Sequence, residues 1–359
     1  MSHRESLKAI LDGGRPPTLC QFEWGYWPET VRRWRSEGMP ADQEPWEAAG
    51  ITWYHRVPVH TRFYPVFEPA VLSETGETRI IRDENGIVQE VARNRTTFPR
   101  FLKHPVKDLS DFNALRDRLD PDTPGRFPVD WPAGARALNQ RDSILVMGNV
   151  EISFFGWHRD LMGVENLLTA FYDQPALIHA ISEHHLGFLT SLYTRIAREV
   201  QFDFIFFWED MSFKNGPLIS PAMVREFMLP YYRELIGRLK PLTGCRVLLD
   251  SDGDVRKLIP LFLEAGVDGM LPFEVAAGMD IREIRREYPD LIICGGIDKR
   301  EIAKGTAAID RELGDKLPFL FERGRYVPGM DHHVPPEVSW KDFLYYLERT
   351  REIYRRSLP

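Results

Sequence analysis

The chain has 359 residues, of which 43% are hydrophobic and 28% are charged, as in a folded globular protein rather than a disordered or fibrous one. Its formal net charge is −7 and no basic tract is present, so the chain lacks the basic patch with which proteins usually bind nucleic acid or anionic membranes. No apolar run approaches the ~20 residues that span a bilayer, and no secretory signal is visible, so we expect a cytoplasmic protein.

The first part of the chain predicts one short strand and an inserted hairpin. An apolar run at residues 18–22 is typical of a strand. Residues 63–98 are predicted as a hairpin near the N-terminus, because Asn85 and Gly86 lie between β-type residues and favour a type I′ turn. This hairpin is expected either to form a flap over the mouth of the fold or to cover an exposed edge.

From residue 144 onward, short apolar runs alternate with helical patterns. The runs lie at residues 144–147, 204–207, 246–249, 267–271, 291–294 and 326–327, and the helices at 175–199, 220–239 (kinked by Pro230), 281–288, from about 299, and 336–354. Such apolar runs are typical of parallel strands covered on both faces. The alternation indicates βα units, and we favour a (β/α)8 TIM barrel that forms a single domain over residues 1–359. A doubly wound sheet is the alternative, but no G-x-G-x-x-G turn is present.

In such a barrel, the residues that act on a substrate follow the carboxyl ends of the strands. The polar residues at these positions are Glu23, Asn149, Glu151, Glu209, Asp210, Asp250, Asp252, Glu274, Asp298, Asp331, His332 and His333. Crowded carboxylates repel one another unless a cation, a basic side chain or a bound proton lies between them. Arg159, Lys214, Arg256 and Lys299 lie in the same loops and could supply part of that charge. Asp254 and Asp298 are also suited to the simpler role of helix N-caps.

Three groups of site residues follow from these positions. The predicted catalytic residues are Glu209, Asp210, Asp250 and Asp252. Asp250 and Asp252 with His332 offer oxygen and nitrogen ligands for zinc or a harder divalent ion, and hydrogen bonding without a metal is the alternative. The predicted substrate-binding residues are Glu23, Trp24, Tyr26, Glu151, Trp157, Arg159, Lys214 and Glu274. Their aromatic members either wall a pocket for a flat, apolar ligand or belong to the ordinary core.

Several stretches, taken in order, resemble the uroporphyrinogen decarboxylase superfamily, which includes the haem-pathway decarboxylase and the methylcobamide:coenzyme M methyltransferases. The similar stretches are Glu209-Asp210-Met211, Gly216-Pro217-Leu218-Ile219-Ser220-Pro221, Asp250-Ser251-Asp252-Gly253-Asp254-Val255, Glu264-Ala265-Gly266-Val267-Asp268, Gly278-Met279-Asp280, Cys294-Gly295-Gly296-Ile297-Asp298 and Pro335-Pro336-Glu337-Val338. The resemblance runs from about residue 140 to the end, with a weaker match at Gly25-Tyr26-Trp27. It implies a (β/α)8 barrel, in agreement with the alternation of strands and helices.

The chain departs from both branches of that superfamily. Where the decarboxylases carry a motif of the type C-R-Q-A-G-R-Y, this chain reads CQFEWGY from Cys20 to Tyr26, so that both arginines are missing and Glu23 is added. Where the methyltransferases hold zinc with a His-x-Cys pair, this chain has Asp250 and Asp252, so the thiolate ligand is absent.

The resemblance implies, first, a corrinoid-linked methyltransferase or demethylase that acts on a small methylated substrate. A partner protein would supply the corrinoid, a divalent metal such as zinc would be retained if the aspartates bind one, and Glu209 or Asp210 would act as general acid or base. The alternatives are a decarboxylase of a tetrapyrrole acid that needs no cofactor, and a non-catalytic ligand-binding barrel. A homodimer is the candidate assembly.

Overall fold

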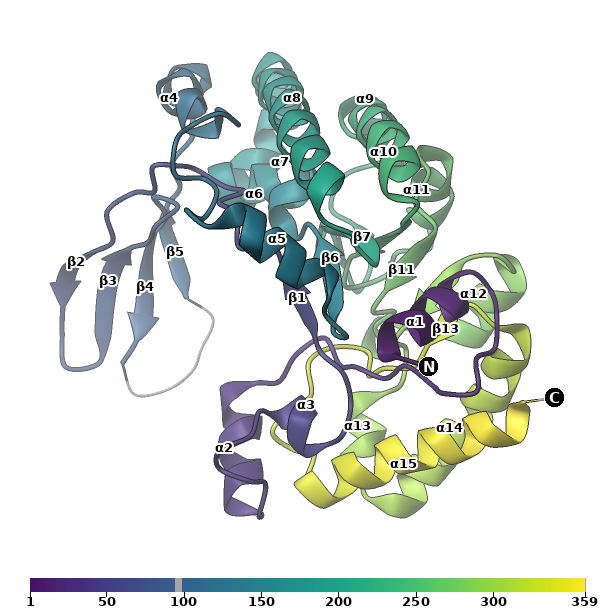
Figure 1. The fold of residues 1–359 in the computed structure, drawn as a ribbon. Coiled ribbons are helices and arrows are strands. Elements are labelled where there is room, and N and C mark those ends of the chain that lie inside the picture. The colour runs from purple at the N-terminus through teal and green to yellow at the C-terminus, as the bar shows by residue number, and fades with distance from the viewer. Residues whose placement is uncertain (94–98, 359) are drawn as a thin grey trace.

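The computed structural model describes residues 1–93 and 99–358, and its main feature is a curled parallel sheet (Figure 1). Seven strands form this sheet within the described ranges, and every neighbouring pair is parallel. In spatial order they are β1 (Tyr54–Arg56), β6 (Ile144–Met147), β7 (Phe204–Trp208), β10 (Arg246–Asp250), β11 (Gly269–Leu271), β12 (Ile292–Cys294) and β13 (Tyr326–Val327). All but β1 lie at the apolar runs that predict strands.

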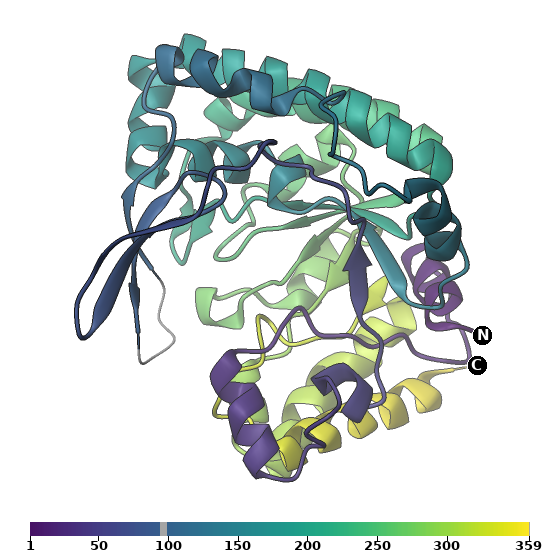
Figure 2. The same cartoon turned by 60° about the vertical axis from the view of Figure 1, so that its left-hand side comes forward.

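Helices connect the strands and cover the convex side of the sheet (Figures 1 and 2). They are α1 (His3–Leu11), α2 (Pro28–Ser36), α3 (Pro45–Ala48), α4 (Leu109–Leu115), α5 (Trp131–Asn139), α6 (Phe155–Met162), α7 (Val164–Asp173), α8 (Pro175–Glu199), α9 (Pro221–Phe227), α10 (Leu229–Thr243), α11 (Ile259–Ala265), α12 (Ile281–Glu287), α13 (Lys299–Ile302), α14 (Thr306–Arg323) and α15 (Trp340–Ser357). Short 3₁₀ helices lie at η1 (Arg116–Leu119), η2 (Val150–Ile152) and η3 (Val275–Ala277). In the part of the chain that the structure describes, no helix combines the length and apolar character needed to cross a bilayer.

The helix predictions differ from the structure at two places. The predicted helix from Ser220 is divided into α9 and α10, and Pro230 lies in the first turn of α10, where its missing N–H costs no hydrogen bond. Asp298 caps α13, since its carboxylate accepts the N–H of Arg300 at 2.9 Å. The cap predicted at Asp254 is wrong, because α11 begins only at Ile259.

The strand predicted at residues 18–22 is not formed, so the described residues do not complete an eight-stranded barrel. This segment instead runs between the two edges of the sheet and bonds irregularly to both. On the β1 side, the Gln21 carbonyl accepts the N–H of Thr52 at 3.1 Å. On the β13 side, Met330 N–H donates to the Glu23 carboxylate at 3.0 Å, where a regular ladder would use a backbone carbonyl.

Between β1 and β6 the chain forms a separate antiparallel sheet that projects from the main body (Figures 1 and 2). Its strands are β2 (Ala70–Glu74), β3 (Thr78–Arg82), β4 (Val88–Ala92) and β5 (Arg100–Lys103). The region predicted as one hairpin, residues 63–98, therefore contains more strands than expected, and residues 94–98 lie outside the described residues. The type I′ turn is wrong: Asp83 to Ile87 connect β3 to β4, and Gly86 has a positive φ of 83° whereas Asn85 does not.

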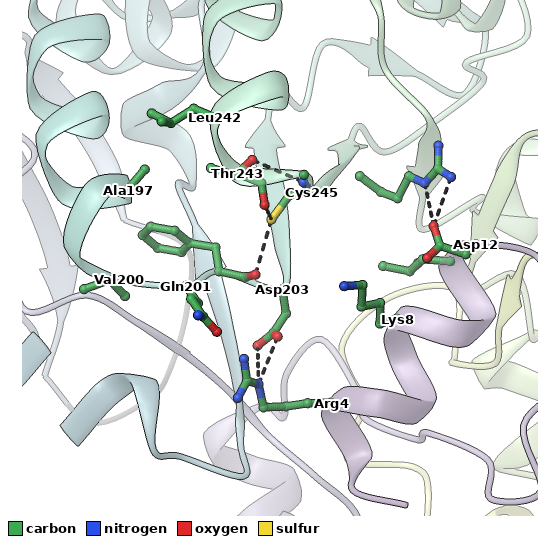
Figure 3. Close-up of a pocket in the computed structure, with 14 residues that line it drawn as sticks. Arg4, Lys8, Asp12, Ala197, Val200, Gln201, Asp203, Leu242, Thr243 and Cys245 are labelled. Atoms are coloured by element: carbon green, nitrogen blue, oxygen red, sulfur yellow. Dashed lines mark hydrogen bonds and ion pairs between the residues drawn. The ribbon is translucent and has the colours of Figure 1, made fainter. Parts of the chain in front are cut away.

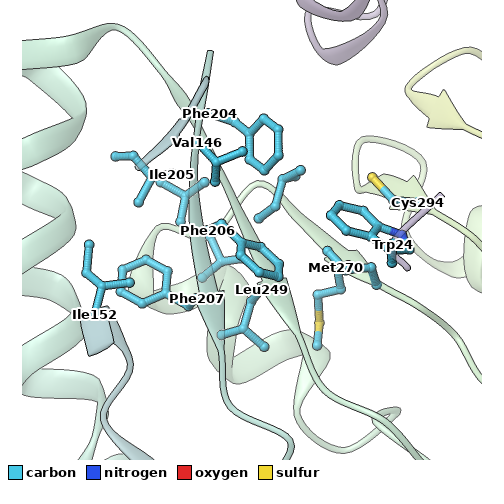
Figure 4. Packing of buried hydrophobic residues seen from close by; sticks show 14 of the residues in the cluster. Trp24, Val146, Ile152, Phe204, Ile205, Phe206, Phe207, Leu249, Met270 and Cys294 are labelled. Carbon is cyan, nitrogen blue, oxygen red and sulfur yellow. The ribbon is translucent and has the colours of Figure 1, made fainter. Parts of the chain in front are cut away.

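The interior of the curled sheet is filled by large aromatic side chains, shown in Figure 4. Along β7 successive side chains point to opposite faces of the sheet. Phe206 faces inward and stacks on Trp24, with ring centroids 5.6 Å apart, whereas Phe207 faces the helices and contacts Tyr232 at 5.0 Å. Trp24, from the irregular segment, thus closes the interior on the concave side.

Candidate active site at the carboxyl ends of the strands

A cavity of about 420 Å³ lies at the carboxyl ends of the parallel strands. In a curled parallel sheet this is the end where loops from several strands converge, and where barrel enzymes hold their substrates. The residues that line it are Trp24, Trp27, Tyr54, Arg56, Asn149, Phe206, Trp208, Asp210, Asp250, Asp252, Pro272, His332 and His333.

Aromatic rings form much of the cavity wall. Trp24 lies 5.8 Å from Tyr54 and 5.6 Å from Phe206, measured between ring centroids. On another side, the ring of Trp208 lies 5.1 Å from the guanidinium of Arg159. Of the aromatic residues predicted to bind substrate, Trp24 lines the cavity.

Three aspartates from two neighbouring strand ends line the same cavity, as predicted for Asp210, Asp250 and Asp252. The Asp210 carboxylate is paired with Arg159, whose Nη1 lies 2.7 Å from Oδ2 and equally close to the Asp210 carbonyl. Asp210 has a positive φ of 44°, an uncommon conformation for a residue with a side chain. The two bonds to Arg159 hold this turn in place.

Asp252 is paired with His332, whose Nε2 lies 3.4 Å from Oδ2. Burial alone would lower the pKa of His332, but the hydrogen bond and the charge of Asp252 outweigh burial and raise it. The neighbouring His333 has no such partner within the described ranges, so burial and the nearby His332 lower its pKa to about 4. Gly25 makes room for His333, because a Cβ at this position would fall 2.6 Å from Nε2.

Asp250 is the carboxylate without a partner: among the described residues its side chain makes no hydrogen bond or ion pair. Burial raises its pKa well above the ordinary range, and the negative charges of Asp252 and Asp210 raise it further, while Arg159 acts in the opposite direction. A proton or a positive ligand group is therefore favoured at this carboxylate.

Arg56 is a cavity residue that the sequence patterns do not identify. It ends β1 and lines the cavity, and its charge influences the phenol of Tyr54. No carboxylate in the described ranges lies within ion-pair distance of its guanidinium. Asn149 and Pro272 also line the cavity, Asn149 after β6 and Pro272 after β11.

Glu209, predicted as catalytic, does not line the cavity. Its carboxylate is fully buried and accepts the N–H groups of Phe154 at 2.8 Å and Gly156 at 2.7 Å. Burial raises its pKa to about 7 despite these hydrogen bonds. Consecutive side chains at a strand end point in opposite directions, so Glu209 fixes the start of α6 while Asp210 reaches the cavity.

Several residues predicted to bind substrate also lie away from the cavity lining. Tyr26 is partly buried and packs against Trp34, Trp53 and Phe343 at the border of the core. Trp157 is buried and stacked on His185 at 5.0 Å, so this ring belongs to the core.

The charged residues of the same prediction have structural partners or face solvent. Lys214 is exposed between β8 (Ser212–Phe213) and β9 (Gly216–Pro217), and Glu151 is buried in η2. Glu274 accepts the N–H of Gly253 at 3.2 Å and lies 3.7 Å from Lys299 Nζ. Arg159 lies outside the cavity lining and contacts two residues that belong to it, Asp210 and Trp208.

Glu23, also predicted to bind substrate, connects distant parts of the chain. Its carboxylate is buried, accepts the N–H of Met330 and accepts the hydroxyl of Tyr346, each at 3.0 Å. Burial raises its pKa to about 8, an effect that the two hydrogen bonds only partly offset. Glu23 lies outside the cavity lining and holds the irregular segment in place.

The donor geometry does not fit a metal centre. Within residues 1–93 and 99–358, no three His, Cys, Asp or Glu side chains converge as a metal ion requires. Of the predicted ligands Asp250, Asp252 and His332, only the last two contact each other. We therefore derive no chemistry from a metal.

A second cavity, of about 370 Å³, lies at the opposite end of the sheet, near the amino ends of β7 and β10 (Figure 3). Its arginines are already paired. Arg4 Nε lies 3.0 Å from Asp203, and Arg246 Nη2 lies 2.9 Å from Asp12. Both arginines of this lining are therefore neutralised within the chain, whereas Lys8 lines the cavity without an ion pair among the described residues.

Comparisons with known proteins agree with this architecture. The family model for uroporphyrinogen decarboxylase (URO-D) matches residues 84–353. Among solved structures, a methyltransferase from Methanosarcina mazei superposes with a TM-score of 0.59 over 99% of this chain and 99% of its own, at 13% sequence identity. At that identity the likeness concerns the fold. A search of curated proteins finds no match.

Proposed function

The chain belongs to the uroporphyrinogen decarboxylase family, and on that premise we propose that it is a methyltransferase that removes a methyl group from a small substrate. The substrate would lie in the cavity at the carboxyl ends of the strands. The methyl acceptor would be a corrinoid that a partner protein presents at the mouth of this cavity.

The observation that carries this proposal is the charge of the cavity wall. Three aspartates line it, against one arginine and a histidine paired with an aspartate. A tetrapyrrole acid would bring several carboxylates to a lining whose arginine is Arg56, and the carboxylates not bound there would be repelled by Asp250. The segment from Cys20 to Tyr26 also lacks the two arginines of the decarboxylase motif. Decarboxylation of such an acid is therefore the less favoured function.

The size of the cavity supports a small substrate. A volume of about 420 Å³ lies in the lower half of the range of about 300 to 1,000 Å³ that is usual for small-molecule sites. When bound, a corrinoid supplies the nucleophile that accepts a methyl group. The role of this chain is to bind the donor, orient it and exclude water from it, for which Trp24, Tyr54 and Phe206 provide apolar surface.

Removal of the methyl group also requires a proton for the heteroatom of the substrate. The heteroatom of the substrate keeps the electron pair of the broken bond and then takes up a proton. Two cavity residues can hold that proton, Asp250 and His332, because the pKa of each is raised above its ordinary value.

The test uses the full chain with reduced cobalamin as acceptor and a panel of O-, N- and S-methylated donors. We expect demethylated product, detected by mass spectrometry, only when cobalamin is present. Asp250→Asn should lower the rate by about a hundredfold or more. Asp290→Asn is the matched control, since the Asp290 side chain is 99% exposed.

Two outcomes would overturn the proposal. Release of carbon dioxide from uroporphyrinogen by the chain alone would establish the decarboxylase. Tight binding of donors without turnover, equal in both variants, would favour a non-catalytic ligand-binding barrel.

A further inference from the structure

The charges of the cavity wall do not all find partners within the chain. Asp210 is bonded to Arg159 at 2.7 Å, and Asp252 is paired with His332 at 3.4 Å. The remaining charged side chains of the lining are the carboxylate of Asp250 and the guanidinium of Arg56. One negative and one positive group therefore face the same cavity, and in the described structure they do not pair with each other.

Among the charged groups behind the lining, the buried carboxylate of Glu151 and the guanidinium of Arg56 both act on the phenol of Tyr193, but no ion pair joins Glu151 to Arg56 in the described ranges. Lys299 Nζ lies 3.3 Å from Asp331 and 3.7 Å from Glu274, so these three side chains neutralise one another in part. The charge that a ligand meets is set mainly by Asp250 and Arg56.

We propose that the cavity binds a small zwitterion, with a methylated ammonium group at Asp250 and a carboxylate at Arg56. This inference rests on the proposed function in one respect, because a methyl group on that nitrogen would be the one transferred. A neutral tertiary amine would leave, and His332 is the cavity group placed to protonate it.

The aromatic wall supports an ammonium group that carries methyl groups rather than hydrogens. Trp24, Tyr54 and Phe206 line the cavity beside Asp250. Methylated ammonium groups cannot donate the usual hydrogen bonds, and proteins recognise them by aromatic faces together with a nearby negative charge. Arg159 already occupies the vicinity of the Trp208 ring, and Trp27 stacks on His332 with ring centroids 6.4 Å apart. The remaining rings of the lining are Trp24, Tyr54 and Phe206.

Other ligand classes fit the same wall less well. A neutral ligand would leave both Asp250 and Arg56 unpaired while displacing the water that solvates them, which is costly for charged groups. A ligand with only a positive charge would satisfy Asp250 and leave Arg56 alone. A zwitterion neutralises both.

Three probes of nearly equal shape separate these possibilities. N,N,N-trimethylglycine carries both charges, choline lacks the carboxylate, and 3,3-dimethylbutyrate replaces the nitrogen by carbon. By calorimetry and tryptophan fluorescence on the full chain, we expect trimethylglycine to bind at least roughly tenfold more tightly than either of the others.

Two substitutions assign each charge to its partner. Asp250→Asn should remove the preference for trimethylglycine over 3,3-dimethylbutyrate, and Asp250→Glu should retain it. Arg56→Gln should instead remove the preference for trimethylglycine over choline. Asp290→Asn serves as the control, and thermal unfolding of each variant verifies that it is folded.

Equal binding of 3,3-dimethylbutyrate and trimethylglycine to the unmodified chain would overturn the inference, whatever the variants do. Tight binding of trimethylglycine without its demethylation would preserve the inference and count against the proposed function. Demethylation of a neutral methoxy compound, with no binding of trimethylglycine, would do the reverse.

Discussion

The two ends of the parallel sheet each contain a cavity, of about 420 Å³ at the carboxyl ends and about 370 Å³ at the amino ends. Similar in volume, they differ in how their charges are arranged. At the amino ends, Asp203 binds two arginines and a backbone N–H. At the carboxyl ends, no ion pair within the described residues neutralises Asp250 or Arg56, although the Arg56 side chain is hydrogen-bonded to the phenol of Tyr54.

This difference separates groups that stabilise the fold from groups kept ready for a ligand. A buried carboxylate bonded on all sides contributes to stability, and its loss leaves its partners unpaired. A carboxylate crowded by other carboxylates slightly destabilises the folded chain, and only a bound ligand or proton removes this repulsion. Cavity size alone therefore does not identify the functional end of the sheet.

The largest effect is expected from alanine substitutions at the two ends. Asp203→Ala should lower the free energy of unfolding by about 3 to 5 kcal/mol, because Arg141, with 8% of its side chain exposed, would lose its carboxylate. Asp250→Ala should leave that free energy unchanged or raise it. Urea unfolding followed by circular dichroism measures both, and equal losses would remove the distinction between the two cavities.

An effect of similar size concerns Glu23, which lies at the carboxyl ends but outside the cavity. Its pKa of about 8 in the folded chain exceeds the ordinary 4.5, so the folded chain keeps a proton that the unfolded chain has lost. The stability of the fold must therefore fall as the pH rises from 4.5 to about 8, and level off above that.

Glu23→Gln isolates this contribution, because the amide stays neutral and can still bond to Met330 and Tyr346. Between acid and alkaline pH, we expect the free energy of unfolding of the variant to gain about 5 kcal/mol relative to that of the unmodified chain, as measured by urea unfolding at each pH. Parallel stability curves for the two proteins would show that Glu23 is ionised throughout.

The smallest effect is expected at His332. Asp252→Asn should lower the pKa of His332, measured by NMR titration of its ring, while Asp290→Asn should not. The pair stabilises the fold fully below the ordinary pKa of 6.5 and loses its effect as the pH rises through the raised value. Both side chains are almost a third exposed, so the loss of stability should be roughly 0.5 kcal/mol or less. An unchanged pKa of His332 in Asp252→Asn would show that Asp252 does not influence this ring.

The sequence predicts most of the sheet but not its edge. The strands β7 and β10 are continuous apolar runs, which burial on both faces requires. The edge strand β1 consists of Tyr54, His55 and Arg56, and the last two are exposed, so it leaves no apolar signal. Arg56 is missed for this reason, although it is central to the proposed ligand.

Site residues were predictable as a group rather than one by one. Glu209 and Asp210 are neighbours with the same chemistry, and the left-handed φ of Asp210 helps to decide which of them reaches the cavity. Trp24 and Trp157 both follow a predicted strand. Trp157 lies on α6 and turns toward His185, and the direction in which a helix presents one ring cannot be read from composition.

The two hydrogen bonds of Glu23 have a consequence for how the chain folds. They join residues 307 and 323 positions apart in the sequence, among the longest separations in the molecule. Bringing such distant points together has a high entropic cost, and contacts of this kind slow folding. On the ribosome, the two hydrogen bonds of Glu23 can both form only after Tyr346 has been synthesised, so the seam between β1 and β13 cannot close completely until nearly the whole chain has been made.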